Sequence, residues 1–511
     1  MLIDRIVVSV IQVDAMQSLR PMFIILVSII SMSLVIYQHE RDWHRTDFRV
    51  FLILGMLLLY RSLYGLVKIK YPQQADYLAL GLIPISGQLF LKVSCSRIWR
   101  WFGDPARLSS YLNLVFAILL IFQVVRLSEA TDNVLASEAR PEFTAIAPLT
   151  GEIHLNAGTR PDIYVIVLDG YGRQDVLQQI YGYDNTGFLQ ELEGRGFYVA
   201  NASHSNYVQT PFSVVSLLNF DYVQAWRPQS NYARYLNLPI QANRVYNLLD
   251  EIGYTTISFE TGPTYTQIES SDVYLSDFLP FNKFETFLLM DSPIEPLSSA
   301  YDLEIAIPSY ETHRKRTLYT FDELKEIPAS IPGPRIVYAH ILLPHPPFAF
   351  DGYGNSVDPQ RPYTLQDGDE FEGSLEEYRE GYQEQVMFAN NRIMDTVDAI
   401  LANSKTPPII ILMSDHGPGS MFRWDINSPG CLWERTSNLY AVLLPGHQND
   451  GMMYSSMTPV NSFRVIFNTY FGTELPLLED RTYLMASQYQ GQIADITQTR
   501  DSTANCSVSD D

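Results

Sequence analysis

Residues 163–173 read IYVIVLDGYGR, an apolar β-branched and aromatic run that stops at Asp169 and Gly170. Similar runs recur along the chain and alternate with helical stretches. The predicted strands are 163–168, 254–259, 335–341, 407–413 and 439–444. The predicted helices include 186–195, 241–252 and 376–402. Strands that are apolar on both faces and alternate with helices indicate an α/β fold, with a mostly parallel central sheet covered by helices on both faces.

The charge is distributed unevenly along the chain. Of its 511 residues 46% are hydrophobic and 18% charged, and the net charge is −22. Residues 1–128 contain 13 Lys and Arg against 7 Asp and Glu, so the remainder carries a net charge of −28. This composition excludes a largely disordered chain. A domain so acidic also lacks the basic surface that general nucleic-acid binding needs, so no nucleic-acid partner is expected.

Four apolar runs lie in residues 1–128, and we predict a transmembrane region there. The predicted spans are 21–37, 50–67, 77–91 and 111–125. Each run reaches or approaches the length of a membrane-spanning helix, although buried helices of a soluble domain are the alternative. Arginines cluster in the first and third connecting loops. The positive-inside rule therefore places the residues after 128 outside the cytoplasm.

The rest of the chain divides into three predicted segments. Residues 129–160 are polar and irregular and are predicted to be a linker, and residues 161–475 form the main domain. Residues 476–511 are predicted to be a C-terminal extension that ends in a loose acidic tail. The three cysteines are too few for a disulfide scaffold or a cysteine-rich zinc site. Cys431 and Cys506 can pair outside the cytoplasm, but the sequence leaves that open.

Two strand ends carry residues that can ligate a metal. Asp169 follows the first strand, and in PPIIILMSDHGPGS, residues 407–420, Asp415 and His416 follow another. In a parallel sheet, ligands bind at the carboxyl ends of the strands. Adjacent Asp and His offer oxygen and nitrogen ligands to Zn²⁺ or Mn²⁺. A carboxylate that caps a turn is the alternative for Asp169.

A threonine and two histidines are further candidates. Thr210 precedes Pro211 and an apolar helical stretch, so we predict that it is the N-cap of a helix. There it is either an ordinary cap or a nucleophile, placed where a helix N-terminus favours an anion. His340 ends a predicted strand, and His345 lies in the proline-rich loop PHPP. Each can bind a metal or a substrate anion, or can simply be packed in the core.

Taken in order, these motifs resemble the sulfatase-like branch of the alkaline phosphatase superfamily. They are most similar to bacterial membrane proteins akin to lipoteichoic acid synthases and phosphoethanolamine transferases. The resemblance implies an alkaline-phosphatase-like domain outside the cytoplasm, in a multi-pass protein of the bacterial plasma membrane. It implies that Asp169, Thr210, Asp415 and His416 hold one divalent cation, Mn or Zn, with Thr210 also the nucleophile. His345, with His340, would contact substrate or a second metal.

Two departures from the family pattern narrow the expected chemistry. True sulfatases carry Cys or Ser in C/S-x-P-x-R, whereas Thr210 begins Thr-Pro-Phe-Ser-Val. Residues 417–444 contain no further histidine, and the nearest is His447. We therefore expect one metal, and His340 and His345 are the candidates for holding a second one. We expect transfer or hydrolysis at a phosphodiester of a phospholipid or glycan-type substrate beside the bilayer.

Other assignments stay open at this point. Asn206, in the loop before Thr210, and Arg435 are candidates for contacts with a phosphate. The alternatives to phosphoryl chemistry are a sulfatase of the same fold and a non-catalytic membrane-anchored binding module.

Overall fold

The computed structural model describes residues 15–50, 53–54, 110–111, 160–225, 240–279, 285–286, 305–425, 428–448, 450–485, 493–503 and 506. The chain divides into two compact units. One contains residues 1–144 and 278–307, and the other contains residues 145–277 and 308–511.

The first unit includes helix α2, Ala15–Glu40. This helix contains the first of the four predicted membrane spans, 21–37. The other three spans and the predicted linker 129–160 lie almost entirely outside the described residues. Among the helices that are described, none is long and apolar enough to cross a membrane.

The second unit is built on a seven-stranded sheet with the order β2-β7-β6-β1-β5-β3-β4. The strands are β1 Ile163–Leu168, β2 Tyr198–Val199, β3 Thr255–Phe259, β4 Val273–Leu275, β5 Arg335–Ile341, β6 Ile409–Met413 and β7 Tyr440–Leu443. β1 lies between β5 and β6 and is parallel to both. β3 and β4 continue the parallel arrangement, whereas β7 is antiparallel to β6 and β2 is antiparallel to β7.

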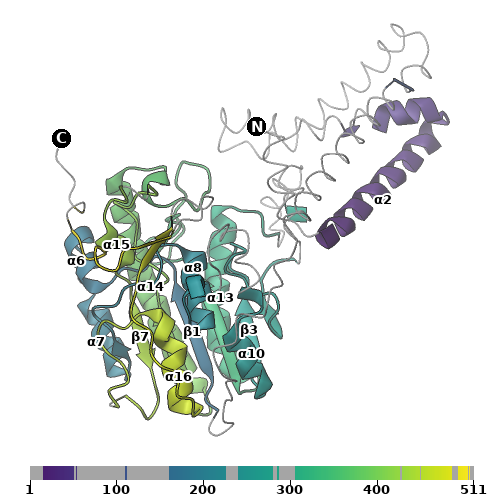
Figure 1. Cartoon of the computed structure of the whole chain (residues 1–511). Coiled ribbons are helices and arrows are strands. Elements are labelled where there is room, and N and C mark those ends of the chain that lie inside the picture. Colours follow the sequence, from purple (N-terminus) through teal and green to yellow (C-terminus); the bar gives the residue numbers. More distant parts are fainter. Residues whose placement is uncertain are drawn as a thin grey trace. The chain divides into compact units, whose positions relative to one another are not determined.

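Helices cover both faces of this sheet (Figure 1). Because side chains alternate along a strand, Tyr164 and Ile166 of β1 pack on one face and Val165 and Val167 on the other. The first face is covered by α6 Gln174–Tyr181, α7 Thr186–Gly194, α13 Tyr310–Ser330 and α14 Leu375–Asn403. The second is covered by α8 Thr210–Asn219, α10 Arg244–Glu251 and α16 Ser462–Tyr470. The predicted mostly parallel α/β fold is confirmed.

The C-terminal segment differs from the prediction of a loose tail. β8 Tyr483–Met485 and β9 Ile493–Asp495 form an antiparallel pair. Cys506 forms a disulfide with Cys431, which is the N-cap of the short helix α15, Leu432–Thr436. The described part of the segment is therefore attached to the domain, because Leu484, Met485 and Ile496 pack into hydrophobic clusters and Cys506 is covalently linked.

Candidate active site

The carboxyl ends of the central strands bring Asp169, Asp415 and His340 together. Val167 is in register with Met413 of β6 and with His340 of β5. Asp169 and Asp415 each follow two residues later, so the parallel pairing places them side by side. His340 Nε2 lies 3.5 Å from Asp169 Oδ2 and 4.0 Å from Asp415 Oδ2. The expectation that these strand ends meet is thus met by the topology.

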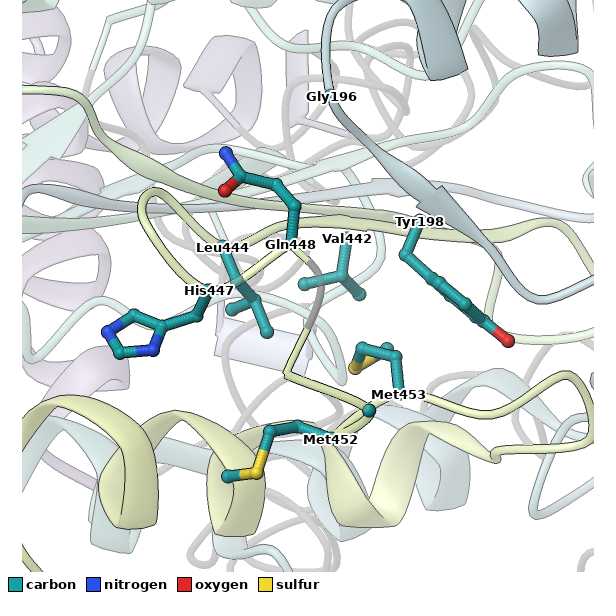
Figure 2. Close-up of a pocket in the computed structure, with 9 residues that line it drawn as sticks. Gly196, Tyr198, Val442, Leu444, His447, Gln448, Met452 and Met453 are labelled. Carbon is teal, nitrogen blue, oxygen red and sulfur yellow. The ribbon is translucent and has the colours of Figure 1, made fainter.

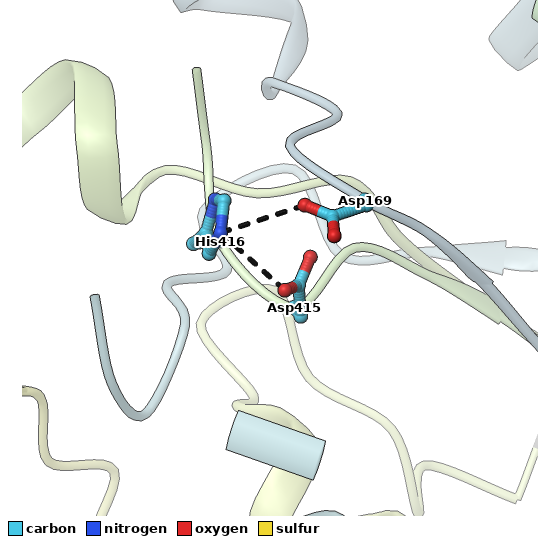
Figure 3. Close-up of side chains that lie close together, drawn as sticks. All are labelled: Asp169, Asp415 and His416. Carbon is cyan, nitrogen blue, oxygen red and sulfur yellow. Dashed lines mark ion pairs between the residues drawn. The ribbon is translucent and has the colours of Figure 1, made fainter. Parts of the chain in front are cut away.

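His416 completes a group of three close ligand atoms with the two aspartates (Figure 3). Its Nε2 lies 3.5 Å from Asp169 Oδ1 and 3.4 Å from Asp415 Oδ2. Its Nδ1 lies 2.9 Å from the carbonyl oxygen of Gly417, so Nδ1 carries the proton and donates it there. Burial and the guanidinium of Arg435 lower the pKa of His416 to about 3. The neutral ring therefore points an Nε2 lone pair toward the carboxylates, as a metal ligand must.

Thr210 is the first residue of α8 and faces this group. Its Oγ1 lies 3.1 Å from His416 Nε2. The predicted position is off by one, because Gln209 is the N-cap residue, with extended backbone angles, and makes no side-chain capping hydrogen bond. The Thr210 hydroxyl is consequently not used in capping. It remains available at the N-terminal end of α8, where free backbone N–H groups favour an anion.

The residues present fit a divalent cation. In the part of the chain that the structure describes, Asp169 Oδ1, Asp415 Oδ2 and both ring nitrogens of His340 are buried without a hydrogen-bond partner. Buried polar atoms are normally paired, and leaving several unpaired in one place is costly. Burial, together with the adjacent Asp415 carboxylate, raises the pKa of Asp169 well above its usual range. A cation among these oxygen and nitrogen atoms would satisfy them and neutralise the carboxylates.

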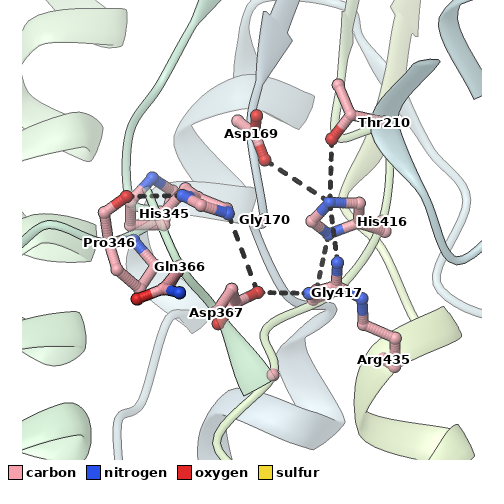
Figure 4. A network of polar contacts seen from close by, with 12 residues as sticks. Asp169, Gly170, Thr210, His345, Pro346, Gln366, Asp367, His416, Gly417 and Arg435 are labelled. Carbon is pink, nitrogen blue, oxygen red and sulfur yellow. Dashed lines mark hydrogen bonds and ion pairs between the residues drawn. The ribbon is translucent and has the colours of Figure 1, made fainter. Parts of the chain in front are cut away.

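Arg435 and Asp367 form a buried ion pair beside the cluster (Figure 4). Arg435 Nη2 lies 3.1 Å from His416 Nε2, so the predicted candidate Arg435 reaches the site. Asp367 was not predicted, since it lies in the stretch QDGDE, which looks like an ordinary acidic surface loop. Only 4% of Asp367 is exposed. Burial acts to raise its pKa, but Arg435 outweighs this and holds the pKa of the carboxyl below its usual range.

His345 lies next to this ion pair rather than at the ligand group of Figure 3. Its Nε2 is 3.7 Å from Asp367 Oδ2, and its Nδ1 donates to the carbonyl of Pro346 at 2.5 Å. The backbone N–H of His345 donates to the carbonyl of Asp169 at 3.0 Å. His345 thus adjoins the site, whereas His340 lies within the carboxylate group itself.

Asn206, which was a candidate for contact with a phosphate, makes hydrogen bonds within the protein instead. Its amide nitrogen donates to Thr458 Oγ1 at 2.9 Å and to the carbonyl of Arg481 at 3.0 Å. Its oxygen accepts from the N–H of Val460 at 2.8 Å. These bonds tie three loops together and occupy the groups that a phosphate would need, so they indicate a structural role for Asn206.

His447 lies away from the metal-ligand group. Because β7 is antiparallel to β6, the residues after Leu443 leave the sheet at the edge where β6 begins, opposite Asp415. There His447 lines a cavity of about 180 Å³ with Val442, Leu444, Met452 and Met453 (Figure 2). His447 Nδ1 lies 2.6 Å from Asp450 Oδ2. It therefore supplies no ligand to the Asp169 and Asp415 cluster.

Comparison with known proteins assigns the family. A family model described as Sulfatase matches residues 161–458, which is more than half of the chain. The chain belongs to the sulfatase family. As a sulfatase-family protein it is a hydrolase or transferase that acts on phosphate or sulfate esters, in agreement with the resemblance noted from its motifs. No curated protein matches the chain.

Several solved structures resemble this sulfatase-family chain in fold. The C-terminal periplasmic domain of EptC from Escherichia coli is 13% identical, with 70% of this chain and 100% of that chain covered and a TM-score of 0.44. A putative sulfatase from Bacteroides thetaiotaomicron is 15% identical, with 65% and 74% covered and a TM-score of 0.39. The phosphonate monoester hydrolase of Agrobacterium radiobacter is 13% identical, with 64% and 80% covered and a TM-score of 0.41. Similarity at this level does not bear on the substrate.

Proposed function

We propose that this sulfatase-family protein is a metal-dependent phosphoryl-group transferase or phosphodiesterase that uses Thr210 as its nucleophile. The observation that carries the proposal is the position of the Thr210 hydroxyl. It lies 3.1 Å from His416 Nε2, at the N-terminal end of α8, beside carboxylate oxygens that have no other partner. Asp169, Asp415 and His416, with Thr210, would hold one Mn²⁺ or Zn²⁺. His340 and His345 are the residues through which a second metal or a substrate would be bound.

The proposed reaction has two displacements. When bound, the cation lowers the pKa of the threonine hydroxyl and polarises the phosphoryl oxygen. Thr210 Oγ1 loses its proton and attacks the phosphorus of a phosphodiester, the bond from phosphorus to the leaving oxygen breaks, and the released alcohol takes up a proton. A second hydroxyl, from an acceptor or from water, then attacks the phosphothreonine and releases Thr210 with its proton restored. Arg435 and the N-terminus of α8 would stabilise the negative oxygens.

Phosphate esters are favoured over sulfate esters by the nucleophile itself. A threonine cannot be converted to the formylglycine that the C/S-x-P-x-R motif of true sulfatases provides, and Thr210 does not lie in that motif. A direct hydroxyl attack on a metal-held phosphodiester needs no such conversion. Sulfate-ester hydrolysis therefore stays the second candidate within the family.

We also propose that the enzyme is held at a bacterial plasma membrane and acts there on a phospholipid headgroup or a glycan-type substrate. Four apolar runs in residues 1–128 support this, and on α2 the side chains of Phe23, Leu26 and Val35 are 67%, 56% and 66% exposed. The Cys431–Cys506 disulfide favours an oxidising compartment outside the cytoplasm for the catalytic domain. Anchoring would keep the active site near a lipid-derived donor.

The test uses the full chain purified in detergent. Metal content is measured by elemental analysis on wild type and Asp415→Ala. Activity is assayed on bis-p-nitrophenyl phosphate, a fluorescent phosphatidylglycerol and p-nitrophenyl sulfate. We expect about one Mn or Zn per chain, lost in Asp415→Ala, and phosphodiesterase activity that falls by about a thousandfold or more in Thr210→Ala. Thr210→Ser, which keeps a hydroxyl, should retain measurable activity with its metal.

Thr469→Ala is the matched control, because its hydroxyl bonds only within α16, to the carbonyl of Val465. It should leave both metal content and activity unchanged. If the Thr210→Ala variant is as active as wild type, the assignment of Thr210 as the nucleophile is refuted. Turnover of the sulfate ester alone would establish the second candidate, and wild type without metal or turnover would leave a binding module.

A further inference from the structure

Asp367 and Arg435 form a buried ion pair beside the metal-ligand group, and other contacts hold each of them in place. Arg435 Nε donates to the carbonyl of Val208 at 3.0 Å, and its Nη1 pairs with Asp367 Oδ2. The guanidinium also stacks on Phe422 and Trp424, at 5.1 and 5.4 Å from the ring centroids. Only 2% of Arg435 is exposed. The cation is therefore held in one orientation, with Nη2 directed at His416.

Asp367 is fixed just as firmly from the other side. The hydroxyl of Tyr378 donates to its Oδ1 at 2.7 Å, and its Oδ2 is shared between Arg435 and the neighbouring ring of His345. A buried ion pair is rarely needed for stability, because desolvation of both charges offsets their attraction. Because the pair lies beside the metal-ligand group, its role is to set the net charge that a substrate meets there.

The charges can be counted from the residues. With one divalent cation bound, its charge and those of the ionised Asp169 and Asp415 carboxylates cancel. Asp367 and Arg435 cancel in the same way. The site is then neutral when substrate arrives. Its net charge therefore gives a dianionic substrate no advantage over a monoanionic diester.

We propose that Asp367 determines specificity by cancelling the charge of Arg435, which directs the site toward monoanionic phosphodiesters and away from dianionic phosphomonoesters. The proposal rests on the proposed function and deepens it. Removing one negative charge at this place strengthens the attraction for a dianion more than that for a monoanion, because the interaction scales with the charge of the substrate. A phosphomonoester carries close to two negative charges above pH 7.

The experiment compares kcat/KM for p-nitrophenyl phosphate with kcat/KM for bis-p-nitrophenyl phosphate at pH 8, using the metal-loaded full chain. Asp367→Asn should raise the ratio of monoester to diester by about tenfold, which corresponds to about 1.4 kcal/mol. Arg435→Gln should lower the ratio by a similar factor. The double variant restores the charge balance, so its ratio should return to that of wild type even where both rates are reduced.

Two controls separate charge from geometry. Tyr378→Phe removes a hydrogen bond to the same carboxylate without changing any charge, so its ratio should stay at the wild-type value. Arg435→Lys keeps the charge but loses the fork geometry, so its ratio should also stay. If Asp367→Asn does not fold, the contrast between Arg435→Gln and Arg435→Lys decides the question alone.

The outcomes distinguish this inference from the proposed function. A ratio that is unmoved in metal-loaded Asp367→Asn, or a double variant that does not return to the wild-type ratio, overturns the role of Asp367. A Thr210→Ala protein as active as wild type overturns the proposed function instead, whatever the ratio does.

Discussion

Asp169→Asn should stabilise the metal-free protein and remove most of the stabilisation that metal provides. In the absence of a cation, the Asp169 carboxylate is 3% exposed, has an unpartnered oxygen and lies close to Asp415. Asparagine has nearly the same shape and no charge. The substitution therefore removes a buried negative charge from the metal-free protein and at the same time deletes a ligand.

The size of the effect follows from the buried charge. Leaving a buried group unpaired costs more when the group is charged than when it is neutral, so replacing the carboxylate by a neutral amide should recover about 1–3 kcal/mol. The unfolding entropy is about 2.1 cal/mol/K per residue, so for a unit that spans residues 145–277 and 308–511 about 1 kcal/mol corresponds to about 1.5 °C in Tm. The variant should therefore melt about 1–4 °C above wild type in EDTA. Wild type should gain about 2.7 kcal/mol from a cation at a hundred times its Kd, and the variant should gain far less.

The pH dependence has a definite sign. Burial and Asp415 raise the pKa of Asp169 in the folded, metal-free protein above its unfolded value. The stability from that protonated carboxyl is complete below the unfolded pKa and is lost as the pH rises through the folded pKa. The advantage of Asp169→Asn over wild type should therefore be larger at pH 8 than at pH 5.

The assay is thermal unfolding of both proteins with EDTA and with Mn²⁺ or Zn²⁺, at the two pH values. Asp398→Asn is the control, because its carboxylate is exposed and pairs only with Arg195 on the surface. It should change Tm little and leave the metal increment intact. An Asp169→Asn protein that is less stable than wild type in EDTA, or that keeps the full metal increment, would refute a cation site at these carboxylates.

Three further predictions concern the surroundings of the site. Gly417→Ala should lower both Tm and metal content, because a Cβ at this position would overlap the carbonyl oxygen of Glu434. Thermal unfolding and elemental analysis measure the two effects, and unchanged values would contradict this packing. Cys506→Ser should destabilise the domain by about 4 kcal/mol in denaturant unfolding, because the Cys431–Cys506 link closes a separation of 75 residues. Equal stability of wild type with and without reductant would argue against the link. His447→Ala should leave metal content and activity unchanged, and a loss of metal would mean that the ligand set is incomplete.

The central sheet was predictable because its strands are apolar on both faces. The runs at 163–168 and 335–341 coincide with β1 and β5, and the run at 407–413 contains β6. Since parallel strands end at the same edge, Asp169 and Asp415 could be placed together from the sequence. The direction of β7 could not, because an apolar run has the same composition whichever way it pairs.

Parts of the site depend on contacts that no local pattern encodes. Asp367 is separated from Arg435 by 68 positions, and an acidic residue in a polar loop is usually solvated. The start of α8 was misplaced by one residue, because Thr-Pro is compatible with threonine as either the cap or the first helical residue. The attached C-terminal segment was missed because a few apolar residues in a mostly polar stretch, such as Leu484 and Ile496, pack against side chains that are distant in the sequence.

The central place of β1 has a consequence for the order of assembly. Ile163 pairs with Ile336 on one side and with Ile409 on the other, so the strand synthesised first in the parallel core waits for partners made much later. Contacts between such distant segments form slowly, since long loops must close before the pairing stabilises them. Asp169 cannot meet Asp415 until that closure is complete. The proposed cation would therefore bind only after the domain has finished folding, and it would come from the ions in the compartment where that last step takes place.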